Sequence, residues 1–230
     1  MTTLLLKLSG PMQAWGAASR FSQRNTRQEP TKSGVVGLLA AAQGRRRTDP
    51  LEDLAALKFG VRVDQPGQLI RDFQTAKSLD DKRTMPLSYR YYLGDAVFVA
   101  GVEGDSNLVG ALAEALRNPT FPLYLGRRSC PPSGPLRLNV SETPLMTALE
   151  SAPWEAANWY RTRQGKSVHL RIAIDAVDGE IGELVRDIPI SFDPTLREYG
   201  WRNVIEHGVN IENPKGRANT HDVMAALGGA

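Results

Sequence analysis

The order of strand-like and helix-like segments in the first 140 residues constrains the fold of this chain more than any other feature. Alternating or continuous apolar stretches predict strands, and apolar residues at helical spacing predict helices. The predicted strands are residues 4–8, 59–63, 96–102 and 136–140, and the predicted helices are residues 34–43 and 108–117. The resulting order (strand, helix, strand, strand, helix, strand) is that of the split βαβ arrangement. We therefore expect an α+β fold with a ferredoxin-like (RRM-like) βαββαβ domain.

Local signals mark the ends of the predicted helices. Ser33 is the expected N-cap of the first helix, and Gly44 is expected to end it in a left-handed C-cap. Asn107 is the expected cap of the helix at residues 108–117. Between the two, Asp49 and Pro50 predict the start of a short helix.

The connection between the second and third strands is far longer than a hairpin needs. It spans residues 64–95 and contains RDFQTAKSLDDKRTMPLSYRYY, which mixes basic and aromatic residues. Connections of this length are usually functional or disordered, so we expect a projecting hairpin at about residues 71–92. After residue 145 the pattern weakens, and residues 169–174 form the one convincing strand. We predict a main domain at residues 1–145, a small β-rich C-terminal part at 146–212 and a flexible tail at 213–230.

Composition limits the class of protein without defining it. The chain has 28 Lys+Arg against 25 Asp+Glu, which permits a polyanionic partner but does not require one. A single cysteine excludes an intramolecular disulfide and a Cys-rich zinc site. No signal peptide or membrane-length apolar run is seen, so we expect a cytoplasmic protein with no membrane partner. P-loop, HExxH and nucleophile-elbow motifs are absent, and we expect no cofactor and no metal.

Cationic and donor-rich side chains gather in four loops, at residues 16–27, 30–34, 71–90 and 126–129, and three of these loops flank strands of the predicted ferredoxin-like core. At PTKSG, Thr31, Lys32 and Ser33 precede a helix whose free N–H groups and dipole favour an anion. At GRRS, Arg127 and Arg128 are able to fork onto phosphate oxygens. One such loop is usually a solvated loop, but several around a ferredoxin-like sheet favour RNA. Aromatic candidates for stacking on bases are Trp15, Phe73, Tyr89, Tyr91 and Tyr92, of which Tyr91 and Tyr92 are also candidates for the core.

The only cysteine lies directly after the GRRS turn. Cys130 is followed by two prolines and has no neighbouring histidine. The nearby Arg127 and Arg128 favour a lower pKa of the thiol, but a cysteine followed directly by two prolines is more often a small packed residue than a nucleophile. We expect Cys130 to be a small packed residue.

Several motifs occur in an order and spacing that resemble a known family. They are GPMQAWG at residues 10–16, PTKSGVVGLLAAAQG at 30–44, LIRDFQT at 69–75, YLGRRSCP at 124–131 and, more weakly, REYGWRNVI at 197–205. Together they resemble the CasD-type subunits of the type I-E CRISPR Cascade complex, within the RAMP superfamily. The resemblance covers the chain to about residue 210.

This resemblance implies a ferredoxin-like domain with a long thumb hairpin and a small C-terminal part. It also implies a non-catalytic subunit that caps the 5′ handle of the CRISPR RNA and contacts the large Cascade subunit and the backbone Cascade subunit, with target DNA contacted only indirectly. Motif position and donor chemistry then give the expected RNA-binding residues: Gln13, Trp15, Thr31, Lys32, Ser33, Arg71, Lys77, Arg90, Arg127, Arg128 and Ser129.

Two alternatives stay open. In a related CRISPR subtype the equivalent subunit is a metal-independent endoribonuclease that processes precursor CRISPR RNA. That chemistry needs a general base, for which His169 with a nearby Lys or Tyr would have to serve, and no grouped set of this kind is seen. The other alternative is a structural adaptor whose basic loops face acidic patches on a protein.

Overall fold

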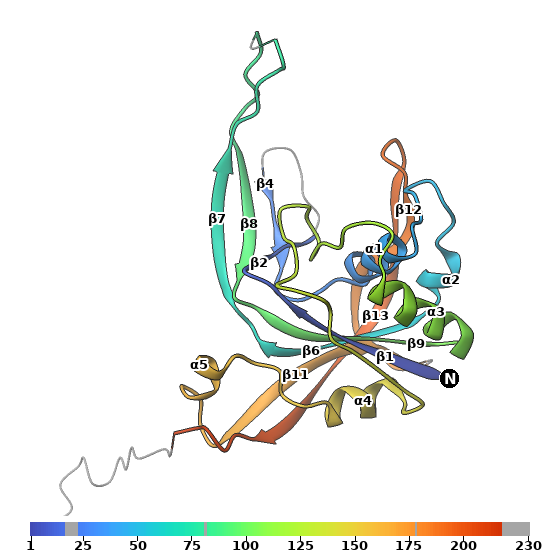
Figure 1. The fold of residues 1–230 in the computed structure, drawn as a ribbon, viewed down its shortest axis with the longest axis vertical. Coiled ribbons are helices and arrows are strands. Elements are labelled where there is room, and N and C mark those ends of the chain that lie inside the picture. Colours follow the sequence, from blue (N-terminus) through green and yellow to red (C-terminus); the bar gives the residue numbers. More distant parts are fainter. Residues whose placement is uncertain (17–22, 81, 178, 218–230) are drawn as a thin grey trace, which may run out of the picture.

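A seven-stranded antiparallel sheet organises most of the chain (Figure 1). In the computed structural model, residues 1–16, 23–80, 82–177 and 179–217 are described. The strands lie in the order β10-β1-β9-β6-β11-β13-β12, and each neighbouring pair is antiparallel. Their bounds are β1 (Thr2–Ser9), β6 (Lys58–Gln65), β9 (Val97–Gly104), β10 (Leu138–Ser141), β11 (Ser167–Asp175), β12 (Glu183–Phe192) and β13 (Arg197–Glu212).

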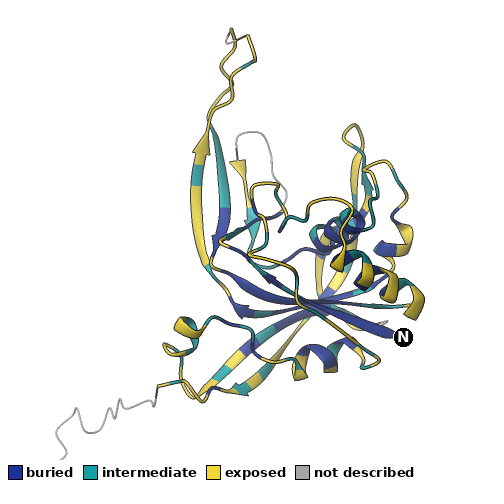
Figure 2. Cartoon of the chain, viewed as in Figure 1, coloured by how far each residue is buried: buried dark blue, intermediate teal, exposed yellow. Residues whose placement is uncertain are grey.

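Helices cover both faces of this sheet (Figure 1). On one face lie α1 (Lys32–Ala42), α2 (Glu52–Ala55) and α3 (Ser106–Arg117), and on the other lies α4 (Leu145–Ser151). Because side chains alternate across a strand, Leu4 and Leu6 of β1 join the core beneath α1 and α3, whereas Leu5 packs with Leu145 and Leu149 of α4. Strands β1 and β9 are therefore buried on both faces (Figure 2), which explains why they read as continuous apolar runs.

A second, smaller sheet is built around β8 (Ser88–Gly94). Strand β8 pairs with β7 (Gln68–Gln74) on one edge, and with β2 (Met12–Gln13) and β4 (Gln23–Arg24) on the other. Strands β7 and β8 form a long hairpin that projects away from the main sheet and is mostly exposed toward its tip (Figures 1 and 2). Two short strands, β3 (Trp15–Gly16) and β5 (Thr26–Arg27), pair beside it.

The α+β class predicted from the sequence is confirmed, and the main elements follow the predicted order. The first helix begins earlier than expected, because Thr31 is its N-cap: the Thr31 Oγ1 accepts a hydrogen bond from the Gly34 N–H at 3.2 Å. Ser33 lies inside the first turn of the helix. Gly44 follows the helix with φ +79°, as expected for a left-handed C-cap.

The other predicted caps are also displaced. Asp105, not Asn107, caps α3, with its Oδ1 accepting from the Asn107 N–H at 2.9 Å. Asp49 does not cap α2, which begins at Glu52; its Oδ2 accepts instead from the Arg46 N–H at 2.6 Å.

The C-terminal half extends the main sheet. Strand β11, which contains the predicted strand at residues 169–174, pairs with β6, and β13 and β12 follow outward. The short helix α5 (Asn158–Arg161) precedes β11. The sheet is continuous across residue 145, and the division into domains there stays a prediction. Most of the predicted tail, residues 218–230, lies outside the described residues.

Candidate nucleic-acid interface

The GRRS turn is a closed loop that packs against Ala14, between β2 and β3. The Leu125 N–H donates to the Cys130 carbonyl at 2.7 Å, and the Cys130 N–H donates to the Arg127 carbonyl at 2.9 Å. Gly126 has φ +89°, and a Cβ there would lie 1.8 Å from the Ala14 carbonyl oxygen. The Ala14 N–H in turn donates to the Leu125 carbonyl at 3.1 Å. Only glycine fits this close approach of two backbones.

Arg127 fastens this turn to the small sheet. Its Nη1 donates to the Tyr91 carbonyl at 3.1 Å, and its Nη2 donates to the Arg24 carbonyl at 2.7 Å and the Asn25 carbonyl at 3.2 Å. The guanidinium also lies 5.0 Å from the centroid of the Tyr92 ring. Arg127 therefore uses its donors within the protein and acts as an anchor.

The two residues after the anchor face outward. Arg128 is exposed, and within the described residues its side chain has no hydrogen bond and no ion pair. Ser129 is exposed, with its Oγ 3.5 Å from the Tyr92 hydroxyl. Of the predicted GRRS contacts, Arg128 is the side chain whose guanidinium donors remain available to an external anion.

Two further arginines lie on the face of the hairpin that Arg127 contacts. Arg24 of β4 is the register partner of Arg90 on β8, and Tyr92 shares this face because it lies two residues beyond Arg90. Arg24 is exposed, while Arg90 is half-buried and its buried Nε has no hydrogen-bond partner. We call Arg24, Arg90, Arg127 and Arg128 the arginine corner. Asp72 is the cross-strand partner of Arg90 on this face, but as far as the structure describes the chain none of the four arginines forms an ion pair, so positive charge predominates, as expected of an anion-binding surface.

Two predicted cationic residues lie outside the arginine corner. Arg71 of β7 lies on the opposite face of the hairpin, where its guanidinium is 5.6 Å from the Tyr89 ring centroid. Phe73 is the register partner of Tyr89 on that face and is 66% exposed. Lys77 lies near the hairpin tip, in a bridge with Thr84. The outer face and the tip therefore form a second surface of the hairpin.

Gln13 and Trp15 are fully buried and make internal contacts. The Gln13 Nε2 donates to the Ala96 carbonyl at 2.7 Å and to the Leu8 carbonyl at 3.3 Å, and its Oε1 accepts from the Trp15 Nε1 at 3.1 Å. The structure does not support the predicted direct contact of these side chains with RNA. They instead hold in place the segment between β2 and β3, where Ala14 contacts the GRRS turn. Tyr92, also a stacking candidate, belongs to the core.

The predicted phosphate corner at the start of α1 is filled by a carboxylate of the protein itself. The Lys32 N–H donates to the Asp187 Oδ2 at 2.8 Å, and the Lys32 Nζ pairs with the Asp175 Oδ2 at 3.0 Å. Thr31 is buried and caps the helix, and Ser33 is only partly exposed. Thr31 and Lys32 were predicted to contact RNA, and in this structure a carboxylate of the protein already satisfies the helix N-terminus where an RNA phosphate was expected.

Arg202 of β13 completes this buried cluster. Its Nε and Nη2 donate to the two oxygens of Asp187 at 2.6 and 2.9 Å, and its Nη1 donates to the Asp175 Oδ1 at 2.6 Å. Burial opposes the charge of Arg202, but the hydrogen bonds and charges of Asp187 and Asp175 outweigh it and raise the pKa of the guanidinium. The cluster therefore joins α1 to the C-terminal strands.

Cys130 is confirmed as a packed residue. Its side chain is fully buried in the main core. Burial raises the pKa of the Cys130 thiol, although Ser129 and Arg127 act in the opposite direction. A buried thiol with a raised pKa is a poor nucleophile.

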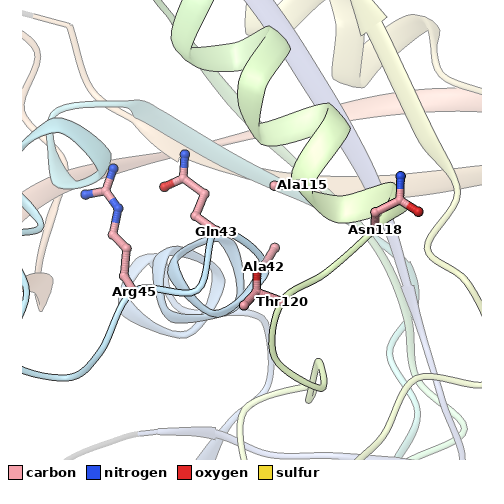
Figure 3. A pocket seen from close by; sticks show the side chains of 6 residues that line it. All are labelled: Ala42, Gln43, Arg45, Ala115, Asn118 and Thr120. Atoms are coloured by element: carbon pink, nitrogen blue, oxygen red, sulfur yellow. The ribbon is translucent and has the colours of Figure 1, made fainter.

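A pocket of about 440 Å³ lies elsewhere, between the C-terminal ends of α1 and α3 (Figure 3). It is lined by Ala42, Gln43, Arg45, Ala115, Asn118 and Thr120. Arg45 is held in a bidentate pair by Asp53, and this hydrogen bonding keeps the pKa of Asp53 below its usual range. The pocket contains none of the predicted RNA-binding residues.

Neither a metal cluster nor a membrane helix is found in the part of the chain that the structure describes. No three His, Cys, Asp or Glu side chains there are grouped to hold a metal ion. No helix among these residues combines the length and apolar character that crossing a bilayer requires.

An antiparallel α+β fold with a projecting hairpin and an unpaired arginine cluster defines a candidate nucleic-acid-binding protein. The family model described as "CRISPR-associated protein (Cas_Cas5)" matches residues 3–205. The chain therefore belongs to this family of CRISPR-associated proteins.

Named relatives agree with this membership. "CRISPR system Cascade subunit CasD" of Escherichia coli (strain K12) is 34% identical over 160 residues, which cover 60% of this chain and 71% of that protein. A solved structure named "Crystal structure of Cas protein" is 42% identical, with a TM-score of 0.71 over 95% of this chain and 100% of that chain. A chain of a "CRISPR RNA-guided surveillance complex" is 31% identical, with a TM-score of 0.76 over 98% of this chain and 97% of that chain. The CasD-type resemblance predicted from the motifs is confirmed.

Proposed function

We propose that this chain is a non-catalytic RNA-binding subunit of a type I-E CRISPR Cascade complex, and that it caps the 5′ handle of the CRISPR RNA in antiviral defence. The observation that carries the proposal is the arginine corner, in which Arg24, Arg90 and Arg128 surround the anchor Arg127 without an ion pair in the described structure. Guanidinium groups match phosphate oxygens in geometry as well as charge. The similarity to a Cascade subunit and to a chain of an RNA-guided complex supports RNA as the ligand.

The fold supports a ferredoxin-like core with a thumb. Strand order β10-β1-β9-β6, with α1 and α3 on one face, is the arrangement that the split βαβ pattern requires. The β7–β8 hairpin takes the role of the thumb. The arginine corner lies at its base, so the guide strand would run between the hairpin and the GRRS turn.

We further propose that the hairpin joins this subunit to its protein partners, the large Cascade subunit and the backbone Cascade subunit. Exposed apolar side chains follow the hairpin, with Phe73 66%, Met85 58% and Leu79 fully exposed. Apolar groups of this size gathered on one projecting element are typical of an interaction site. Target DNA would be reached only through the guide RNA, and the assembled complex would act in the cytoplasm.

The endoribonuclease alternative has weaker support. His169, the base that such an enzyme would need, lies on β11 of the main sheet, not on the hairpin sheet that carries Arg24 and Arg90. Its Nδ1 is 2.8 Å from the Asn210 Oδ1. A base separated from the arginine corner is unable to act on RNA held there.

The proposal is tested with purified protein and a labelled RNA that carries the repeat-derived 5′ handle. The double variant Arg90→Gln/Arg128→Gln should bind more weakly and lower the slope of log K against log salt by about 1.4, because each phosphate of a single strand that a cation neutralises adds about 0.7 to the slope. Arg117→Gln is the matched control, because Arg117 is an exposed arginine on α3 that is paired with Glu114. An unchanged affinity and salt slope in the double variant would refute the role of the arginine corner.

The same RNA, incubated with the wild-type protein in EDTA, tests the absence of catalysis. We expect the RNA to stay intact. Specific cleavage within the repeat would support the endoribonuclease instead.

A further inference from the structure

A second group of aromatic and basic side chains lies around α5, on the side of the molecule away from the hairpin tip (Figure 1). Trp159 is 48% exposed, and the Arg163 guanidinium lies 5.2 Å from the centroid of its ring. Tyr160 meets the Trp159 ring edge-on at 5.8 Å and also packs edge-on against the buried Trp154 at 6.3 Å. The exposed indole is therefore held by an aromatic cluster on its inner side.

A network of hydrogen bonds holds the last described residues, which include two basic side chains, beside this indole. The buried Asn213 donates from its Nδ2 to the Arg161 carbonyl at 2.8 Å and to the Gly165 carbonyl at 2.9 Å. The Lys215 Nζ donates to the Asn158 Oδ1 at 2.8 Å. The Arg217 N–H donates to the carbonyl of residue 164 at 2.9 Å. Residues 213–217 are thus fixed against the α5 turn.

The surface formed in this way is strongly cationic. Arg163, Lys166, Lys215 and Arg217 are all exposed. Throughout the described ranges, none of these four forms an ion pair. Proteins that bind single-stranded nucleic acids combine exposed aromatic rings with unpaired cations. Bases stack on the rings, and the phosphates contact the cations.

We propose that this surface binds single-stranded nucleic acid at a place separate from the arginine corner. We call it the Trp159 patch and define it as Trp159, Arg163, Lys166, Lys215 and Arg217. A base stacks on the open side of the Trp159 indole, and neighbouring phosphates lie on the four cations. Stacking and phosphate contact do not depend on base identity, so the patch accepts any sequence.

Fluorescence anisotropy with fluorescein-labelled dT20 and U20 tests the proposal on the full-length protein. Trp159→Ala should weaken binding about tenfold, within the range known for loss of one base–aromatic stack, while Trp159→Phe should retain most of the affinity. The triple variant Lys166→Gln/Lys215→Gln/Arg217→Gln should lower the salt slope by about 2, from about 0.7 for each phosphate. A duplex of the same length should not respond to Trp159→Ala.

Trp201→Ala is the matched control. Trp201 is 61% exposed, and the Arg186 guanidinium lies 6.0 Å from the centroid of its ring. The β12–β13 hairpin therefore presents a second exposed tryptophan with an arginine beside it. Its replacement should leave both oligonucleotides bound with wild-type affinity. An equal loss in Trp159→Ala and Trp201→Ala would overturn the assignment.

Binding at the Trp159 patch is separated from binding at the arginine corner by introducing Trp159→Ala into the Arg90→Gln/Arg128→Gln variant. In Arg90→Gln/Arg128→Gln protein, dT20 should still bind, and Trp159→Ala should weaken this remaining binding about tenfold. Two results would overturn the proposal, provided that circular dichroism shows a folded protein. One is that the double variant no longer binds dT20, and the other is that Trp159→Ala leaves the remaining binding unchanged. A preference for U20 over dT20 or the reverse identifies the strand that the patch takes, and either result supports it.

Discussion

Replacing Gly126 by alanine should displace the GRRS turn and destabilise the protein by about 2–3 kcal/mol. The left-handed conformation at φ +89° costs an L-residue about 1–2 kcal/mol. The added Cβ would lie 1.8 Å from the Ala14 carbonyl oxygen, so the two backbones must separate by more than 1 Å to reach normal contact (~3 Å). This separation breaks the hydrogen bond between the Ala14 N–H and the Leu125 carbonyl, which contributes about 0.5–1.5 kcal/mol.

The assay is urea denaturation of wild type, Gly126→Ala and Gly134→Ala, together with the affinity of each for handle RNA. Gly134 belongs to the same loop, but a Cβ there meets no atom within 4 Å, so Gly134→Ala should match the wild type in both measurements. Gly126→Ala should also weaken RNA binding, because the displaced turn carries Arg127 and Arg128 away from β8. A Gly126→Ala protein within about 0.5 kcal/mol of wild type would refute this account, since 1–2 kcal/mol is expected from the backbone conformation alone.

Further predictions concern buried groups outside the arginine corner. Asp187→Ala removes two of the three carboxylate hydrogen bonds of Arg202 and the partner of the Lys32 N–H, while Asp175 still pairs with Arg202, and should lower the free energy of unfolding by about 1–3 kcal/mol; a loss below about 0.5 kcal/mol in urea denaturation would contradict this. Lys32→Met should change handle-RNA affinity less than about twofold, because the Lys32 ammonium is buried against Asp175. A tenfold loss of affinity (about 1.4 kcal/mol) would instead indicate that Lys32 contacts the RNA directly. Cys130→Ser should keep wild-type RNA affinity, and since burial raises the pKa of the thiol, native protein at pH 8 should react with a disulfide reagent slowly and unfolded protein fast. Rapid labelling of the native protein would contradict the packed role of Cys130.

The helices and central strands were predictable because their signals are local. Apolar periodicity identifies β1, β6, β9, α1 and α3, and the glycine after α1 marks its end. Caps were displaced because several Ser, Thr, Asp and Asn residues lie within a few positions of each helix start, and local sequence does not decide which side chain reaches the free N–H groups.

Strands β12 and β13 were not predicted, and their structure gives the reason. Register shifts between Arg186 and Ile188 and between Pro189 and Ser191 interrupt the alternation that identifies a strand. Their outer face also carries exposed apolar residues, such as Leu184 at 63%, so the pattern of inward apolar and outward polar residues is lost.

The interface was predictable at the level of segments but not of side chains. The sequence indicates the GRRS turn and the hairpin, but it does not show that the donors of Arg127 are used within the protein. Arg24 lies in the basic segment at residues 16–27 and was not predicted as a site residue. No sequence signal pairs the start of α1 with Asp187, which lies 155 residues away. Burial of Gln13, Trp15 and Lys32 likewise depends on tertiary packing, which donor chemistry alone does not reveal.

The arginine corner is tested most directly by photo-crosslinking in the assembled complex. The subunit is co-purified with its partner subunits and a guide RNA that carries 4-thiouridine in its 5′ handle, irradiated, digested and analysed by mass spectrometry. The account predicts crosslinked peptides from residues 124–131 and from β8, which carry the GRRS turn and Arg90. Handle crosslinks confined to other subunits, or to faces of this chain remote from those segments, would contradict it.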